Sequence, residues 1–420
     1  MRTYRPILAI AAVALAAILV SAPAVAAPPA ADTTACSTAV RDRVSVLSPT
    51  YGSELAASRS AVTVRLCAPG MRNLDARSWH APDAAHPDKT GYDRLVANVQ
   101  PDASGFATFT FPASQFPRGP IVLRMSAWNS PPGDPSFSKT DTAYLQLYNR
   151  AGASWNEGAP SAVPAAAAGK RLVHLQDFRT PITISRTGIG ADYASRKPDT
   201  ASGSEFGDGI FGDDNGVIDP FTQLDSQYLR IRATKNPAGY TDPAGWGRQY
   251  TTGNLASART DGTGTAFSLG YFEARILFPA GAGAWGSFWT MSLNSLPAGR
   301  GLASTAEVDI VEQYGHDPAH VCQAQHWWLG KPETHATNCS TGFTRGDVAN
   351  TWHVYGVNIT STDTIYYLDG SEVWRQPTSD QAKTPMYYYL TLGLGGGWPV
   401  DLSRSGNQID MYVDYVRVYA

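Results

Sequence analysis

Apolar and polar residues alternate over short stretches along most of the chain, the pattern of strands with one face in a core and the other in solvent. In the N-terminal part the alternating stretches are residues 62–66, 106–111, 121–125 and 144–148. Beyond residue 170 they are residues 171–175, 228–232, 270–276, 352–357 and 411–419. Glycine and proline separate these stretches. The pattern therefore predicts an all-β protein.

One of these stretches also carries its own turn signal. Residues 365–374 contain Asp369-Gly370 between two alternating runs. An Asp-Gly pair is favoured in two-residue hairpin turns because both residues adopt positive φ there. The sequence therefore predicts a β-hairpin centred on Asp369 and Gly370.

The spacing of the strands divides the chain into domains. Residues 36–150 have the short strands and frequent turns of an immunoglobulin-like β-sandwich. Residues 151–169, which end in a Pro/Ala-rich run, are interpreted as a linker. Residues 170–420 form a second β-sandwich, of a size that remains compatible with one domain. We expect the chemistry in this second domain and a binding or spacer role for the first.

The first 26 residues have the features of a signal peptide. Arg2 and Arg5 precede an apolar run over residues 7–20, and Ala24-Val25-Ala26 follows as a cleavage signature. The apolar run is short for a membrane span. The sequence therefore predicts a secreted, extracellular protein without a membrane partner.

Composition narrows the classes of partner. Of the residues, 43% are hydrophobic and only 16% are charged, and the formal net charge is -3. No basic run could follow a phosphate backbone, so nucleic acid is not an expected partner. The 20 tyrosines and 11 tryptophans favour β-structure and stacking surfaces. A monomer is expected.

The four cysteines fit an oxidising compartment. They allow three pairings. Cys36 and Cys67 lie in the first region, and Cys322 and Cys339 lie in the second. Pairing within each region, Cys36–Cys67 and Cys322–Cys339, is the simplest arrangement if the two regions are separate domains.

The segment Glu307-Val-Asp309-Ile-Val-Glu312 alternates carboxylates with strong β-formers, so it is predicted to be a strand. On a regular strand, Glu307 and Asp309 point to one face and the residues between them point to the core. Strict alternation would bury Glu312, where an unpaired carboxylate is costly. We therefore predict a β-bulge near residues 310–311 that returns Glu312 to the face of Glu307.

Three carboxylates on one face repel one another, which raises at least one pKa and keeps a carboxylic acid available near neutral pH. Cleavage of a glycosidic bond with retention needs one carboxylate as nucleophile and one carboxylic acid as proton donor. A solvated acidic strand edge and a calcium site are the alternatives for this pattern.

Several tryptophans are candidates for the wall of a sugar-binding cleft, because aromatic rings match the flat C–H faces of sugars. The candidates are Trp285, Trp289, Trp398 and one of Trp327 and Trp328, with Trp328 preferred. Only one of the last two can face the cleft, since they are adjacent on a strand. Packing in the core is the alternative for each of them.

Five motifs occur in order along residues 170–420. They are Gly270-Tyr-Phe-Glu-Ala-Arg-Ile, Gly283-Ala-Trp285-Gly-Ser-Phe-Trp289, Glu307-Val-Asp309-Ile-Val-Glu312, Gly395-Gly-Gly-Trp398-Pro and Met411-Tyr-Val-Asp414-Tyr-Val-Arg-Val-Tyr. Together they resemble glycoside hydrolase family 16, in particular its laminarinase branch. The resemblance implies a β-jelly roll with a concave cleft and a retaining mechanism.

The resemblance also implies residue roles. Glu307 would be the nucleophile, Glu312 the general acid and then base, and Asp309 a hydrogen-bonding partner between them. His326 would face the cleft close to these acids, with a core or surface histidine as the alternative reading.

Calcium is the one ion that the resemblance suggests. The ion would lie on the convex face near Asp177 and Asp414, in a structural role. No cofactor is expected to be required for catalysis.

The function predicted from these observations is that of a retaining endo-glycoside hydrolase acting on a β-linked polysaccharide, with β-1,3-glucan as the best single substrate. Another polysaccharide, such as a galactan, a mixed-linkage glucan or a bacterial exopolysaccharide, is the alternative within the same class. The alternative from another class is a non-catalytic carbohydrate-binding protein.

Overall fold

The computed structural model describes residues 36, 39–80, 92–131, 134, 141–155, 158–198, 205–213, 216–296, 304–330, 332–342 and 347–420. The predicted signal peptide, residues 1–26, lies outside these residues. Within the described ranges, no helix has both the length and the apolar character needed to cross a bilayer.

The N-terminal strands form two sheets around one core. The first sheet has the order β1 (Ser45–Ser48), β3 (Ala61–Cys67), β6 (Phe106–Pro112), and the 3₁₀ turn η1 (Ala113–Gln115) follows β6. The second has the order β2 (Ser53–Leu55), β8 (Asp141–Asn149), β7 (Gly119–Trp128), β4 (Asn73–His80), β5 (Tyr92–Val99). Val64 and Phe111 of the first sheet share a buried cluster with Leu123 and Leu145 of the second. The region is thus a β-sandwich, and its immunoglobulin-like character stays a prediction.

The C-terminal strands form a larger two-layered sandwich. The layer that we call the outer sheet contains β9 (Leu172–Gln176), β12 (Gly209–Phe211), β13 (Phe221–Leu224), β14 (Tyr228–Lys235), β17 (Tyr271–Leu277), β22 (Trp352–Ile359), β23 (Asp363–Leu368), β24 (Ser371–Pro377) and β26 (Gln408–Tyr419). The layer that we call the cleft sheet contains β10 (Ile184–Ser185), β11 (Tyr193–Ala194), β16 (Ala266–Phe267), β18 (Ala284–Ser292), β19 (Thr305–Tyr314), β20 (His320–Trp328), β21 (Glu333–Gly342) and β25 (Met386–Leu394). β15 (Tyr250–Ala256) pairs with strands of both layers. Short 3₁₀ turns complete the chain, namely η2 (Ala165–Ala167), η3 (Leu293–Ser295), η4 (Asp380–Lys383) and η5 (Ser403–Ser405).

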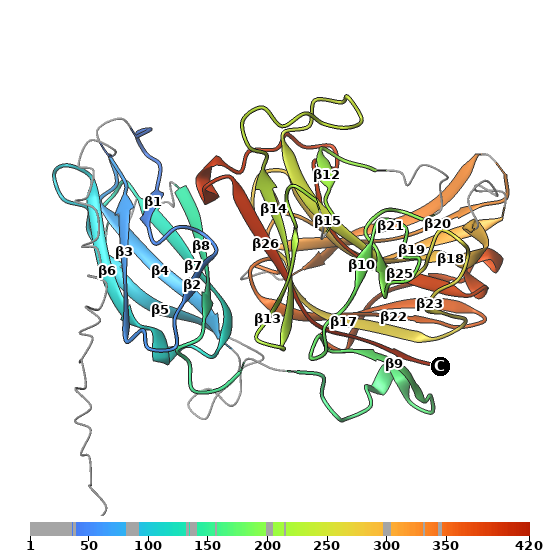
Figure 1. Cartoon of the computed structure of the whole chain (residues 1–420). Helices are drawn as coiled ribbons and strands as arrows, with labels where there is room; N and C mark the ends of the chain where they lie inside the picture. The colour runs from blue at the N-terminus through green and yellow to red at the C-terminus, as the bar shows by residue number, and fades with distance from the viewer. Residues whose placement is uncertain are drawn as a thin grey trace, which may run out of the picture.

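The main hydrophobic core fills the space between these two sheets. Leu229 and Ile231 of β14 belong to the same buried cluster as Val308 and Val311 of β19. The alternation in the sequence therefore correctly predicts which side chains of these strands face the core. The predicted jelly-roll-like sandwich is confirmed (Figure 1). The predicted hairpin is also present, because Asp369 and Gly370, at φ 50° and 77°, connect β23 to β24.

The N-terminal sandwich packs against the outer sheet, beside β14 and β26 (Figure 1). The apolar part of this junction joins Tyr148 of β8 to Tyr228 and Tyr412, and the Tyr148 and Tyr412 rings stack 6.1 Å apart. Charged pairs border the apolar part of the junction. Arg150, for example, pairs with Asp225 at 3.0 Å and with Glu54 at 2.6 Å. The two sandwiches thus share a buried interface.

The predicted linker packs on the same sheet. Gly158 N donates to Asp414 at 3.0 Å, and Arg417 donates to the carbonyl of Pro160 at 2.7 Å. Asn358 donates to the carbonyl of Ala166 at 3.0 Å. Residues 158–169 therefore lie along the C-terminal sandwich as part of its surface, and do not form a free tether.

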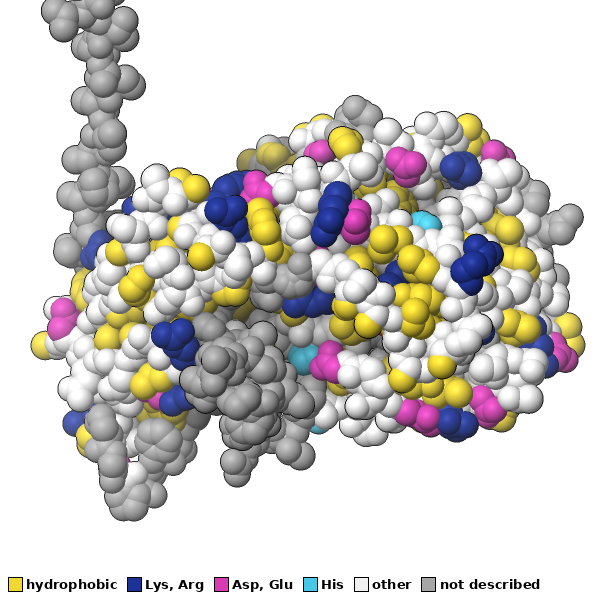
Figure 2. Space-filling view, turned by 90° about the horizontal axis from the view of Figure 1, so that it is seen from below, with side chains coloured by type: hydrophobic (Ala, Val, Ile, Leu, Met, Phe, Trp, Pro, Cys, Tyr) yellow, Lys and Arg dark blue, Asp and Glu magenta, His cyan; other side chains and the backbone are white. Residues whose placement is uncertain are grey.

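Both predicted disulfides are present. Cys36 is bonded to Cys67, and Cys322 is bonded to Cys339. On the face of the molecule seen in Figure 2, basic and acidic side chains are interspersed, and no continuous basic stripe crosses the surface. This distribution agrees with the small formal net charge of -3.

Candidate active site

Strand β19 carries the predicted bulge. On β18 the neighbours Phe288 and Trp289 have partners that are two residues apart on β19, so Ile310 is the extra residue. The register against β20 shifts between Asp309 and Glu312 as well. The side chains of Ile310 and the residue after it are both buried in the core, so Glu312 faces the same side as Asp309. The bulge is confirmed.

The bulge brings the three acidic residues to one hollow. Glu307, Asp309 and Glu312 line a cavity of about 160 Å³ on the cleft sheet. The other lining residues are Lys197, Phe206, Trp285, Ser287 and Trp289. The site therefore combines carboxylates, aromatic rings and one ammonium group.

Asp309 is almost fully buried, with 5% of the residue exposed. Burial and the negative charge of Glu307 raise its pKa to about 6, while His326 and Lys197 act in the opposite direction. His326 Nε2 lies 3.3 Å from Asp309, and the other ring nitrogen lies 2.6 Å from Glu333. Burial by itself lowers the pKa of His326, but these two carboxylates raise it to about 10. His326 is therefore an imidazolium that partly neutralises Asp309.

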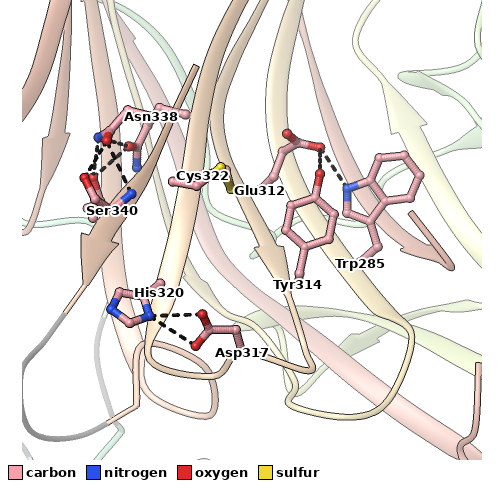
Figure 3. Close-up of a disulfide and its surroundings, with 11 residues drawn as sticks. Trp285, Glu312, Tyr314, Asp317, His320, Cys322, Asn338 and Ser340 are labelled. Carbon is pink, nitrogen blue, oxygen red and sulfur yellow. Dashed lines mark hydrogen bonds and ion pairs between the residues drawn. A yellow bond between two sulfur atoms is a disulfide. The ribbon is translucent and has the colours of Figure 1, made fainter. Parts of the chain in front are cut away.

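Glu312 has two hydrogen-bond donors on a single oxygen. Trp285 Nε1 donates to Oε1 at 2.8 Å, and the Tyr314 hydroxyl donates to the same oxygen at 3.1 Å (Figure 3). Burial and the charge of Asp309 raise the pKa of Glu312 to about 7, although both donors lower it. Because Oε1 is occupied as an acceptor, the proton of the neutral acid belongs on Oε2.

Lys197 reaches the site from the loop after β11. Its Nζ lies 3.9 Å from Glu307 Oε2 and 5.3 Å from the centre of the Trp289 ring. The preceding residue, Arg196, has a buried side chain that lies 3.3 Å from Glu205. This buried ion pair fixes the loop, so the ammonium group is held beside the carboxylate.

The predicted aromatic residues lie on the cleft side to different depths. Trp289 is 4% exposed and stacks on Tyr389 at 3.8 Å, so it is largely a packing residue with one edge in the cavity. Trp328 is 8% exposed and stacks beside His326, whereas Trp327 packs against the core. Trp328 is thus the member of that pair on the cleft face, as preferred from the sequence.

Trp398 lies further out, on the side of the general acid candidate. It is 40% exposed, and its ring lies 4.8 Å from Tyr314 and 4.1 Å from His316. Tyr314 in turn stacks on Trp285. Trp398 does not line the cavity itself, but it extends the row of aromatic rings that begins there.

Arginines accompany the two residues of the predicted calcium site. Asp414 accepts hydrogen bonds from Arg275 at 2.9 Å and from Gln227 at 3.3 Å, and Asp177 lies 3.4 Å from Arg179. Calcium at this place stays a prediction. Among the described residues, the side-chain groups spaced to hold a metal ion are Glu307–Asp309–His326 and His326–Glu333–His335.

Sequence reasoning missed four residues of the site: Lys197, Phe206, Ser287 and Tyr314. Tyr314 had a usable signal, because it lies two residues after Glu312 and so shares its face of the strand. Lys197 and Phe206 come from loops about a hundred residues before β19, and nothing in the local pattern marks them.

A β-sandwich whose bulged strand presents carboxylates to an aromatic-lined cavity supplies the paired carboxyl groups that cleavage of a glycosidic bond requires. Residues 225–417 match the family model for glycosyl hydrolases family 16. The match confirms for this part of the chain the resemblance to family 16 that the motifs indicated.

Two curated relatives show the extent of the similarity. The endo-1,3-1,4-beta-glycanase EglC of Rhizobium meliloti (strain 1021) is 32% identical over 176 residues, which cover 41% of this chain and 34% of that protein. The beta-glucanase of Rhodothermus marinus is 28% identical over 192 residues, covering 41% of this chain and 63% of that protein. The chain thus spans about a third of the length of the first of these relatives.

Among solved structures, the endo-beta-1,3-glucanase from Pyrococcus furiosus aligns with a TM-score of 0.48 and 23% identity. The alignment covers 62% of this chain and 98% of that one.

Proposed function

We propose that this protein is a retaining endo-glycoside hydrolase that cleaves a β-linked glucan. The observation that supports this proposal most strongly is the bulge at Ile310, because it brings Glu307 and Glu312 into one cavity with Asp309 between them. A purely structural strand gains nothing from three crowded carboxylates.

Glu307 is the proposed nucleophile, since Lys197 stands beside it and favours its charged form. It attacks the anomeric carbon and forms a glycosyl-enzyme bond as the glycosidic oxygen leaves. Asp309 forms an ion pair with His326 and lies between the two glutamates, where its charge raises the pKa of Glu312.

Glu312 is the proposed general acid. With its pKa raised to about 7, it holds a proton under mildly acidic to neutral conditions and delivers it to the leaving oxygen from Oε2. As the resulting carboxylate, it then takes a proton from the water that hydrolyses the glycosyl-enzyme bond.

The substrate proposed is a β-1,3-glucan, with a mixed-linkage glucan as the nearest alternative. The names of two relatives, an endo-1,3-1,4-beta-glycanase and a beta-glucanase, support a β-glucan. A galactan is a more distant alternative, favoured by a relative named keratan-sulfate endo-1,4-beta-galactosidase that is 25% identical. We also propose that the protein acts outside the cell, which both disulfides favour.

Azide rescue on an activated aryl β-glucoside oligomer tests the two roles separately. Glu307→Gly with azide should yield an α-glycosyl azide, because azide then attacks the face that the nucleophile has vacated. Glu312→Gly should yield a β-glycosyl azide, because azide replaces water in the second step. On natural glucans and without azide, both variants should lose about 10²–10⁴-fold in kcat/KM.

The matched control is Glu372→Gln, which removes an exposed glutamate that is paired only with Arg375 on β24. It should retain wild-type activity on laminarin, lichenan, agarose and exopolysaccharide alike. Unchanged hydrolysis by the Glu307 variant, or an inverted product from the wild type, would refute the mechanism. Absence of turnover on every glycan, together with binding, would instead support a carbohydrate-binding protein.

A further inference from the structure

A second group of metal-ligating side chains lies on the hairpin of β20 and β21, next to the proposed active site. His326 and His335 are directly opposite each other in the ladder. Glu333 Oε1 lies 2.6 Å from His326 Nδ1 and 3.4 Å from His335 Nδ1. The three donor atoms lie within 4.8 Å of one another.

The donor set indicates which ions fit. Two imidazole nitrogens and one carboxylate oxygen suit zinc, copper or nickel, whereas calcium and magnesium prefer oxygen ligands alone. Tetrahedral zinc with bonds of about 2.0–2.1 Å places its ligand atoms about 3.3 Å apart. The separation of 3.4 Å between Glu333 and His335 already meets this requirement. The distance between Glu333 Oε1 and His326 Nδ1, which is 2.6 Å, must increase when the ion binds.

A second observation concerns the far side of the His326 ring. Its Nε2 lies 3.3 Å from Asp309 Oδ2. Histidines that bind zinc through one ring nitrogen almost always give the other N–H to a carboxylate or a carbonyl, which orients the ring. The buried Asp309 provides such a partner for a metal bound at Nδ1, and it lies between the two glutamates of the proposed mechanism.

No thiol competes for such an ion, because all four cysteines are held in disulfides. The exposures of the side chains also permit an ion to enter: His335 is 59% exposed, Glu333 39% and His326 24%. The fourth position on the metal would be left to water.

We propose that His326, Glu333 and His335 form a binding site for a divalent transition-metal ion of the zinc class, and that the bound ion reversibly inhibits hydrolysis. Coordination replaces the Nδ1 proton of His326 with a divalent ion while Nε2–H stays on Asp309, and the added positive charge changes the charge balance of the three carboxylates. The ion also lies at the edge of the cleft beside Trp328. The inhibitory part rests on the function proposed above, whereas the binding part does not.

The test is a titration of the full secreted chain, without a histidine tag, with zinc chloride in a calorimeter. The wild type should bind one ion, and His335→Ala should raise the dissociation constant at least about tenfold. His320→Ala is the matched control, because His320 is a half-exposed histidine on the same strand that pairs with Asp317 (Figure 3). It should bind zinc as the wild type does. Equal affinity of the wild type and His335→Ala would overturn the site.

A parallel activity assay tests the inhibition. At a zinc concentration of ten times the dissociation constant, about nine-tenths of the sites are filled, so hydrolysis should fall by about tenfold. EDTA should restore it, and His335→Ala should keep its activity throughout. Binding without inhibition would refute the proposed effect of the ion on Asp309, but it would not contradict the metal site. A wild type that hydrolyses no glycan would contradict the proposed function, while the calorimetric result would still decide the site.

Discussion

The two faces of the C-terminal sandwich both bury carboxylates, but they treat the charge in opposite ways. On the outer sheet, Asp410 accepts two hydrogen bonds from Arg232, at 2.6 and 2.7 Å. On the cleft sheet, Glu307, Asp309 and Glu312 crowd around one cavity. The first face pairs each acid with its own arginine, and the second lets acids face one another.

Two further acids of the outer sheet follow the same rule. Glu273 is paired with Arg417, and Asp414 with Arg275. Burial still raises the pKa of Asp414, but Arg275 lowers it. The difference between the faces teaches that burial of an acid is compatible with stability when a fixed cation accompanies it. Where buried acids also crowd one another, as on the cleft sheet, the nearby cations do not offset burial and like-charge repulsion, and the pKa rises toward the range that acid catalysis needs.

The largest effect should come from neutralising Glu312. Glu312→Gln should reduce kcat/KM by about 10²–10⁴-fold on natural glucans, because the proton donor is lost. It should also change stability with pH. The pKa of Glu312 is raised from 4.5 to about 7 on folding, so the folded chain binds more protons and loses stability as pH rises through that window.

Glutamine carries no charge, so the variant should be more stable than the wild type by about 1–3 kcal/mol at pH 8 and little changed at pH 4. Urea denaturation at both pH values measures this difference. A variant less stable than the wild type at pH 8 would show that the carboxylate is compensated after all.

Neutralising an acid of the outer sheet should lower stability and leave the activity of the folded protein unchanged. Asp410→Asn breaks the ion pair between the fully buried Asp410 and the partly buried Arg232 and should lower the free energy of unfolding by about 3 kcal/mol. The folded fraction should still hydrolyse glucan at the wild-type rate. Asp380→Asn removes an exposed partner of Lys383 and is the control, with no measurable loss of stability expected.

The pH dependence of kcat/KM should show the raised pKa of Glu312 that distinguishes the cleft sheet from the outer sheet. kcat/KM should fall above pH 7, tenfold per unit, as Glu312 loses its proton. Tyr314 donates to Glu312 and lowers its pKa, so Tyr314→Phe should move this basic limb upward by about 0.5–1 unit. Initial rates between pH 4 and 9 measure the limb. A downward shift would mean that Tyr314 stabilises the neutral acid.

The smallest expected effect concerns the cation on the cleft side. Lys197 lowers the pKa of Asp309, so Lys197→Met should move the acidic limb of kcat/KM upward by about 0.5–1 unit. Lys197→Arg should restore most of the wild-type profile, whereas a residue with only a packing role would show no such charge dependence. Lys235→Met, at the exposed end of β14, is the control.

Much of the fold followed from local patterns. The strands at residues 62–66, 106–111 and 228–232 lie within observed strands, and the Asp369-Gly370 turn forms where expected. These features depend on the period of two along a strand and on the preferences of neighbouring residues, which the sequence shows directly.

The junction between the sandwiches could not be predicted in this way. Residues 151–169 have the composition of a linker, yet residues 158–169 pack on the outer sheet. Tyr228 and Tyr412 read equally well as surface aromatics, and only the position of Tyr148 shows why both are buried. Contacts between distant segments leave no periodic trace in either of them.

The sequence by itself determined the acidic strand, its bulge and the faces of Glu307, Asp309 and Glu312, because alternation and the cost of a buried charge act within six residues. The tertiary structure alone decided the charge state of these acids. Their pKa values depend on burial, on Lys197 and His326, and on donors such as Trp285, which different strands and loops bring to the same cavity.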